Sequence, residues 1–312
     1  MIRDTTLDYL RGLAIMSIVI GHLYFFSGKA NGSIISNICN SIQIPIFIYV
    51  SGLLASKSVL KYPLQKFIKK RVIRLLIPFC SFFIIWQLIY SFTIDNTITF
   101  FTDEFKRGFW FLLVLFELML ILAINQFIAR KYNIKRIILD SSSFFIINAY
   151  HFFAKDFDIF NQIFSLNLLW HYYPIFLISL YSNKTKKILT SKFAPFYLLV
   201  FCFAFYFLFF RNVHVMLAIC NISSLFFFLT LFNHGYKVME QALVKAGQFS
   251  LEIYLLHILA LNIFRDFIPS IENQYMEAIC YILTASVICF VLIIFSSFLK
   301  KSKVINKILF GT

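Results

Sequence analysis

The chain has 312 residues, of which 60% are hydrophobic and only 14% are charged, and its mean hydropathy is +0.81. A soluble domain of this size needs more polar residues to cover its surface, so the composition excludes a soluble globular protein. A net charge of +15 would suggest nucleic acid binding in a soluble protein, but in a membrane chain it is an orientation signal. We therefore expect an all-α integral membrane protein that binds the lipid bilayer and no nucleic acid.

Apolar stretches long enough to cross a bilayer recur along the whole chain. They predict about ten transmembrane helices in a single membrane domain, residues 1–312, with no appended soluble domain. The predicted spans are approximately residues 7–26, 42–60, 75–94, 109–129, 137–154, 164–182, 193–210, 213–233, 247–265 and 277–299.

The distribution of basic residues predicts the orientation of these spans. With both termini in the cytoplasm, most Lys and Arg residues fall on the inner side, and the outer loops hold only Lys29, Lys106, Arg107, Lys155, Arg211 and Arg265. Cytoplasmic loops of membrane proteins carry such an excess of positive charge. We therefore expect a multi-pass protein of the plasma or inner membrane with both termini cytoplasmic.

The first predicted span contains two ionisable residues, Arg11 and His22. Eleven helical steps of about 100° place both on one face, about 16 Å apart along the axis. Ionisable residues within a span are costly, and they usually face the protein interior or a water-filled cavity and mark a functional site. Asp8, three residues before Arg11, is expected to form an ion pair with its guanidinium group.

A basic segment follows the second predicted span and includes Arg71 and Arg74, which share one side of a helix at a spacing of three. Such a segment either anchors the chain to anionic lipids or binds phosphate groups. Since Arg11 is predicted at the same inner level, the three arginines suit a phosphorylated cytoplasmic ligand.

Several later spans carry polar residues. Glu117 lies on the same face as Trp110, seven residues earlier, and needs a partner or a proton in the membrane. Asp140 and His151 repeat the eleven-residue spacing in a polar span that is expected to line a cavity or to be partly re-entrant.

The ninth predicted span places Tyr254 and His257 on one face. The six cysteines include no C-x-x-C pair, and neither a disulfide framework nor a metal site is predicted.

In order, these motifs resemble the membrane acyltransferase-3 family, the polysaccharide O-acyltransferases, and in particular its sugar O-acetylase branch. Leu7-Asp-Tyr-Leu-Arg-Gly-Leu-Ala-Ile with His22 is similar to the opening motif of the family, and Arg71-Val-Ile-Arg74 to its R-x-x-R. Further similar segments are Pro45-Ile-Phe-Ile-Tyr-Val-Ser-Gly-Leu-Leu54, Trp110-Phe-Leu-Leu, Tyr173-Pro-Ile-Phe-Leu-Ile-Ser-Leu-Tyr181 and Gly247-Gln-Phe-Ser-Leu-Glu-Ile-Tyr-Leu-Leu-His257.

The resemblance implies transfer of an acyl group, usually acetyl from cytoplasmic acetyl-CoA, to a hydroxyl of a cell-envelope or surface glycan or its lipid-linked precursor. Coenzyme A carries three phosphate groups, which suit Arg11, Arg71 and Arg74. The length of its extended pantetheine arm is comparable to the distance of about 16 Å between Arg11 and His22.

Within this interpretation His22 acts as general base, or as a transient acyl acceptor, and Arg11 and Asp8 complete the predicted catalytic residues about three helical turns away on the same helix. The remaining polar residues are expected to support the site or to help admit the acceptor: Trp110, Glu117, Asp140, His151, Tyr254 and His257.

Two other classes of protein remain open. A transporter or flippase for a glycolipid or organic anion would also need polar residues in its spans, but the sequence lacks the paired halves and matching broken helices of inverted repeats. A noncatalytic subunit of an envelope assembly would have no need of the Arg11 and His22 face.

Overall fold

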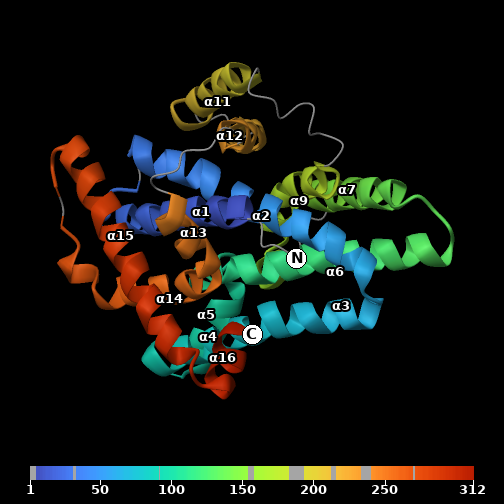
Figure 1. Ribbon diagram of the computed structural model, residues 1–312, viewed down its shortest axis with the longest axis horizontal. Coiled ribbons are helices and arrows are strands. Elements are labelled where there is room, and N and C mark those ends of the chain that lie inside the picture. The colour runs from blue at the N-terminus through green and yellow to red at the C-terminus, as the bar shows by residue number, and fades with distance from the viewer. Residues whose placement is uncertain are drawn as a thin grey trace. The chain divides into compact units, whose positions relative to one another are not determined.

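The computed structural model describes residues 5–30, 33–90, 92–153, 158–182, 193–211, 216–232, 240–269 and 271–312 (Figure 1). Helices make up all of the regular structure in these ranges. The chain divides into two compact units: unit 1 comprises Met1–Val50 and Tyr181–Phe298, and unit 2 comprises Ser51–Leu180 and Leu299–Thr312.

Unit 1 begins with α1 and contains most of the C-terminal third of the chain. Its helices are α1 (Thr5–Phe26), the first part of α2 (Ile34–Lys61), α11 (Ala194–Phe209), α12 (Met216–Phe232), α13 (Glu240–Gln248), α14 (Ser250–Ile263), the short η4 (Arg265–Phe267) and α15 (Gln274–Leu299). α11 and α12 lie side by side (Figure 1) and share a core that includes Phe205, Leu208 and Cys220.

The backbones of α1 and α13 approach each other closely at two glycines. A Cβ atom on Gly12 would lie 1.9 Å from the carbonyl oxygen of Leu243, and one on Gly247 would lie 1.7 Å from that of Asp8. Small residues permit this kind of helix contact in membranes, where van der Waals packing and not the hydrophobic effect holds helices together. The two glycines therefore determine how α1 packs.

The helix predicted over 247–265 is broken near its start. α13 and α14 meet at Phe249 with a bend of 81° between their axes. The amide of Phe249 bonds to the carbonyls of Lys245 and Ala246, and the helix restarts at Ser250. This bend directs α14 along α1.

Unit 2 contains the end of α2, α3 (Leu64–Arg71), the π-helical segment η1 (Val72–Leu76), α4 (Ile77–Tyr90), α5 (Ile94–Thr102), η2 (Lys106–Gly108), α6 (Trp110–Lys131), α7 (Arg136–Phe153), α8 (Asp158–Phe164), α9 (Leu166–Leu180) and α16 (Lys303–Phe310). α6 packs against α3, α7 and α9, and α16 packs against α4. In the π segment the amide of Ile77 bonds to the carbonyl of Val72, five residues earlier.

Among the residues that the structure describes, five helices are long and apolar enough to cross a membrane: Thr5–Phe26, Ile34–Lys61, Leu64–Tyr90, Trp110–Lys131 and Gln274–Leu299. The bent pair Gln241–Gln248 and Ser250–Ile263 would make a sixth. The apolar helices over the predicted spans 164–182, 193–210 and 213–233 are shorter, and α7 is less apolar because of its polar residues. An all-helical membrane protein is thus confirmed, while ten spans and cytoplasmic termini remain predictions.

The close contact at Gly12 gives a test of this packing. Gly12→Ala should lower the unfolding temperature of the purified protein, at a cost of about 1–3 kcal/mol, because the new methyl group would overlap backbone atoms of α13 that cannot rotate away. Gly21→Ala on the same helix is the control. Its methyl group would meet only side-chain oxygens of Asn40 and Gln43 at 3.4 Å, and alanine is the better helix former. Equal unfolding temperatures for the two variants would contradict the packing described.

Candidate functional site

The predicted ion pair between Asp8 and Arg11 is present in the first turns of α1. Nη1 of Arg11 lies 3.5 Å from Oδ1 of Asp8, and the aspartate side chain is only 3% exposed. The Arg11 side chain is 20% exposed. Its guanidinium group is therefore paired with a buried carboxylate and still reaches the surface of unit 1.

The last turns of α1 bring His22 beside His257 of α14. The centroids of the two imidazole rings are 5.0 Å apart, and Phe25 and Phe26 contact the other sides of His22. His257 is fully buried, whereas His22 is partly buried. Sequence spacing placed each histidine on a helix face but did not relate the two, so this pairing is new information from the fold.

The hydrogen bonds of His257 define its tautomer. Its Nδ1 lies 2.7 Å from the carbonyl oxygen of Tyr254 and 3.0 Å from that of Ile253. Carbonyl oxygens only accept, so Nδ1 carries the proton and Nε2 of the neutral ring has a free lone pair. Within the described residues this buried Nε2 has no hydrogen-bond partner. Tyr254, whose ring centroid is 5.9 Å from that of His257, forms part of the same wall.

In unit 2 the two arginines of the R-x-x-R motif lie across the junction of α3 and the π segment. Arg71, the last residue of α3, donates from Nη2 to Oγ of Ser58 at 3.1 Å and lies over the ring of Phe67. Arg74 is inside the π segment and exposed. Short π segments occur often at functional sites because they displace side chains from the regular helical register.

Glu117, on α6, is an unusual carboxylate. Within the described part of the chain neither of its buried oxygens has a hydrogen-bond partner. Lys106, which is fully buried in the loop before α6, exerts an electrostatic attraction on it. Lys106 donates to the carbonyls of Asp103, at 2.7 Å, and Gln162.

Sequence reasoning did not distinguish Lys106 from an ordinary loop lysine. Burial lowers the pKa of Lys106 to about 8, against the opposing attraction of Asp103, Glu104 and Glu117. No local sequence signal marks this residue, since its burial arises from the packing of segments far apart in the chain.

Asp140 forms the centre of a compact hydrogen-bond network between α6, α7 and α9. Its carboxylate accepts from Asn125 at 2.9 Å and from Nε of Arg136 at 3.2 Å, and its backbone carbonyl accepts from the hydroxyl of Tyr173. The side chain is completely buried. These contacts satisfy the carboxylate within the protein, and its predicted role towards the acceptor stays a prediction.

His151 and Trp110 each stack on an aromatic residue of α9. The His151 ring stacks on Trp170 with centroids 3.9 Å apart, and Trp110 stacks on Tyr172 at 5.6 Å. Asp140 and His151, despite their eleven-residue spacing, therefore have separate partners.

The fold and these polar residues define an all-helical membrane protein with buried ionisable groups. A family model described as an acyltransferase domain matches residues 4–298, essentially the whole chain. The chain therefore belongs to the acyltransferase-3 family and is a membrane acyltransferase. This confirms the resemblance of its motifs. Neither a search of curated proteins nor one of solved structures finds a match.

The Asp140 network gives a prediction about stability. Asp140→Ala should lower the free energy of unfolding by about 3–5 kcal/mol, because it leaves the mostly buried guanidinium of Arg136 without its carboxylate. Chemical or thermal unfolding in detergent measures this change. Ser142→Ala on the same helix should change it by less than about 0.5 kcal/mol, since that exposed hydroxyl bonds only to its own helix at the carbonyl of Ile138. A stable Asp140→Ala protein with weaker acceptor binding would instead favour the acceptor role.

Proposed function

We propose that this acyltransferase moves an acyl group, with acetyl as the proposed group, from cytoplasmic acyl-CoA to a hydroxyl group of a cell-envelope or surface glycan or its lipid-linked precursor. The reaction takes place at the plasma or inner membrane, with His22 as general base. The observation that carries the proposal is the pair of histidines in unit 1. One imidazole is partly buried, and the other is fully buried with an unused nitrogen beside it.

The chemistry needs a base that can be regenerated within one cycle. The oxygen of the acceptor hydroxyl attacks the thioester carbonyl carbon while the free nitrogen of His22 accepts the hydroxyl proton. The carbon–sulfur bond then breaks, and the proton passes from the imidazolium to the departing thiolate, giving free coenzyme A and an ester. Metal ions have no part in this scheme.

His257 is the proposed positioning residue for the base. Its Nε2 can accept a hydrogen bond from one nitrogen of His22 after a small rotation of the His22 ring, and this leaves the other nitrogen unprotonated. In many acyl-transfer enzymes the base that activates the nucleophile is itself oriented by a hydrogen bond to another side chain.

Arg11, Arg71 and Arg74 are the proposed ligands for the phosphate groups of the acyl donor. Two contacts support this role. Arg11 is anchored by Asp8 but partly exposed, and the contact of Arg71 with Ser58 leaves the fork of its guanidinium group only partly used. Glu117, Trp110 and His151 remain candidates for acceptor contacts.

Membership of an acyltransferase family does not favour the transporter or flippase alternative. Acyl transfer also gives His22 a role as general base. A passive route for an anion would need the positive charge of Arg11 but no base.

Acetyl transfer tests the role of His22 directly. Purified protein incubated with radiolabelled acetyl-CoA and envelope glycans should label the glycan, and His22→Ala should lower kcat by about 10²- to 10⁴-fold because the general base is lost. Arg11→Ala should mainly raise KM for acetyl-CoA. Ser17→Ala is the control on the same helix, since that hydroxyl bonds only to the carbonyl of Leu13. Undiminished transfer by a folded His22→Ala protein would refute the mechanism.

Replacing His257 tests its positioning role separately. His257→Phe preserves an aromatic ring but removes the accepting nitrogen, and it should reduce kcat by about tenfold while leaving KM for acetyl-CoA unchanged, as expected for one lost hydrogen bond. His257→Gln, whose amide can both donate and accept, should restore part of the rate. An increase in KM with an unchanged kcat would argue that His257 serves only packing.

A further inference from the structure

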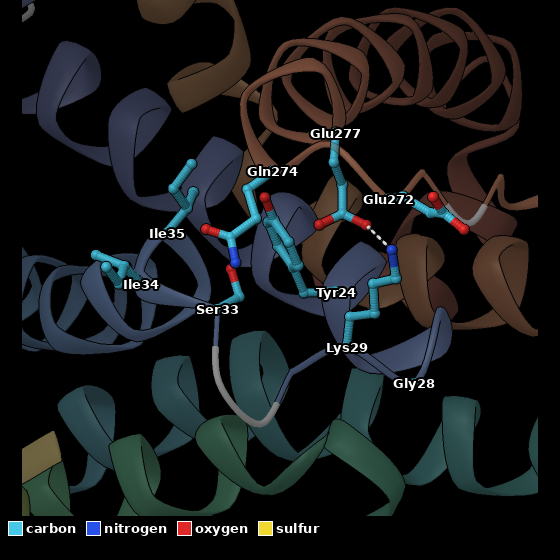
Figure 2. A pocket seen from close by; sticks show the side chains of 9 residues that line it. All are labelled: Tyr24, Gly28, Lys29, Ser33, Ile34, Ile35, Glu272, Gln274 and Glu277. Carbon is cyan, nitrogen blue, oxygen red and sulfur yellow. Dashed lines mark ion pairs between the residues drawn. The ribbon is translucent and has the colours of Figure 1, made fainter. Parts of the chain in front are cut away.

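A polar cavity of about 390 Å³ lies within unit 1, near the end of α1 that carries His22 (Figure 2). It is formed by the end of α1, the start of α2 and the start of α15 with the loop before it. Its lining residues are Tyr24, Gly28, Lys29, Ser33, Ile34, Ile35, Glu272, Gln274 and Glu277. Its volume falls in the range typical of small-ligand sites, about 300–1,000 Å³.

An ion pair between a partly exposed lysine and a buried glutamate forms one wall of this cavity. Nζ of Lys29 lies 2.9 Å from Oε1 of Glu277, whose side chain is only 5% exposed, and it also donates to the carbonyl of Ile271 (Figure 2). Because the Lys29 side chain is 32% exposed, solvent screens the attraction and the pair contributes little to stability. Both charged groups line the cavity, where a ligand can reach them.

The Tyr24 side of the cavity is packed against α15. The ring of Tyr24 packs edge-on against Tyr281 with centroids 4.7 Å apart, and the hydroxyl of Tyr281 donates to the carbonyl of Pro269. When the side chains of a binding site are already packed in place, binding a ligand costs less conformational entropy.

The chemistry of the lining defines the kind of ligand. The phenol of Tyr24, the hydroxyl of Ser33 and the amide of Gln274 can both donate and accept hydrogen bonds, as the hydroxyl groups of a sugar do. Glu272 is exposed, and Lys29 neutralises only one of the two carboxylates, so the formal charge of the lining is −1. Such a site repels a carboxylate on the ligand.

We propose that this cavity is a binding site for a neutral glycan, one or two sugar rings without a carboxylate, and that it supplies the acceptor to His22. This deepens and rests on the proposed function. Tyr24, which lines the cavity, follows His22 by two residues on α1, a rise of about 3 Å, so the cavity lies close to the helix segment that carries the base.

The experiment measures sugar binding to the full-length protein in nanodiscs without an acyl donor, by saturation-transfer NMR. The probes are cellobiose and cellobiouronic acid, which differ by one carboxylate. Cellobiose should bind at least about fivefold more tightly, as expected for one unit charge at contact distance. Glu272→Lys changes the formal charge of the cavity from −1 to +1, a change of two unit charges, and it should shift the ratio of the two affinities by about 25-fold towards the acidic sugar.

Asp266→Lys is the matched control. It makes the same charge reversal at an exposed residue of unit 1 that does not line the cavity, and it should leave the ratio of affinities within twofold. No binding of either sugar to the folded protein, equal binding of both, or the same shift in both variants would overturn the proposal.

The outcomes separate this proposal from the proposed function. Charge-dependent sugar binding by a protein that never transfers acetyl would support the cavity and refute the transferase chemistry. Acetyl transfer to a glycan that is unaffected by Glu272→Lys, with unchanged sugar binding, would support the chemistry and refute the cavity.

Discussion

The contact between the backbones of α1 and α13 at Gly12 and Gly247 is the constraint on which unit 1 depends. α1 carries Arg11 near one end and His22 near the other, so any displacement of this helix moves both. α13 leads through the bend at Phe249 into α14, which carries His257. Two residues without side chains thus fix the relation between the helix of the proposed base and the helix of its neighbour.

Burial alone does not distinguish the functional from the structural polar groups of this chain. Asp140 and Lys106 are both completely buried, and the groups around them satisfy their hydrogen-bonding atoms. Nε2 of His257 and the oxygens of Glu117 are also buried, yet within the described residues they have no partner. A buried donor or acceptor without a partner lowers stability unless a proton or a ligand binds to it. This contrast marks His257 and Glu117 as candidates for a functional role.

Much of the local structure could be predicted because it depends on residues close in sequence. The Asp8 and Arg11 pair follows from a spacing of three on one helix, and the helices around His22 and Glu117 follow from uninterrupted apolar runs. The break at Phe249 could not be predicted, since neither proline nor a charged run marks it. The meeting of His22 and His257 depends on that break. The Lys29 and Glu277 pair likewise joins residues far apart in the chain, and no pattern within either segment indicates it.

The C-terminal helix gives the R-x-x-R segment an unexpected neighbour. α16 ends at Gly311 in a left-handed conformation, and a Cβ atom there would lie 2.1 Å from the carbonyl oxygen of Ile73, between the two arginines. Ser81 of α4 adds a hydrogen bond to the carbonyl of Ile308. Movement of the arginines would therefore be transmitted to the last residues of unit 2. A fluorophore attached at Thr312 would then report on events at the arginine motif, while a bulky affinity tag at the same place would disturb it.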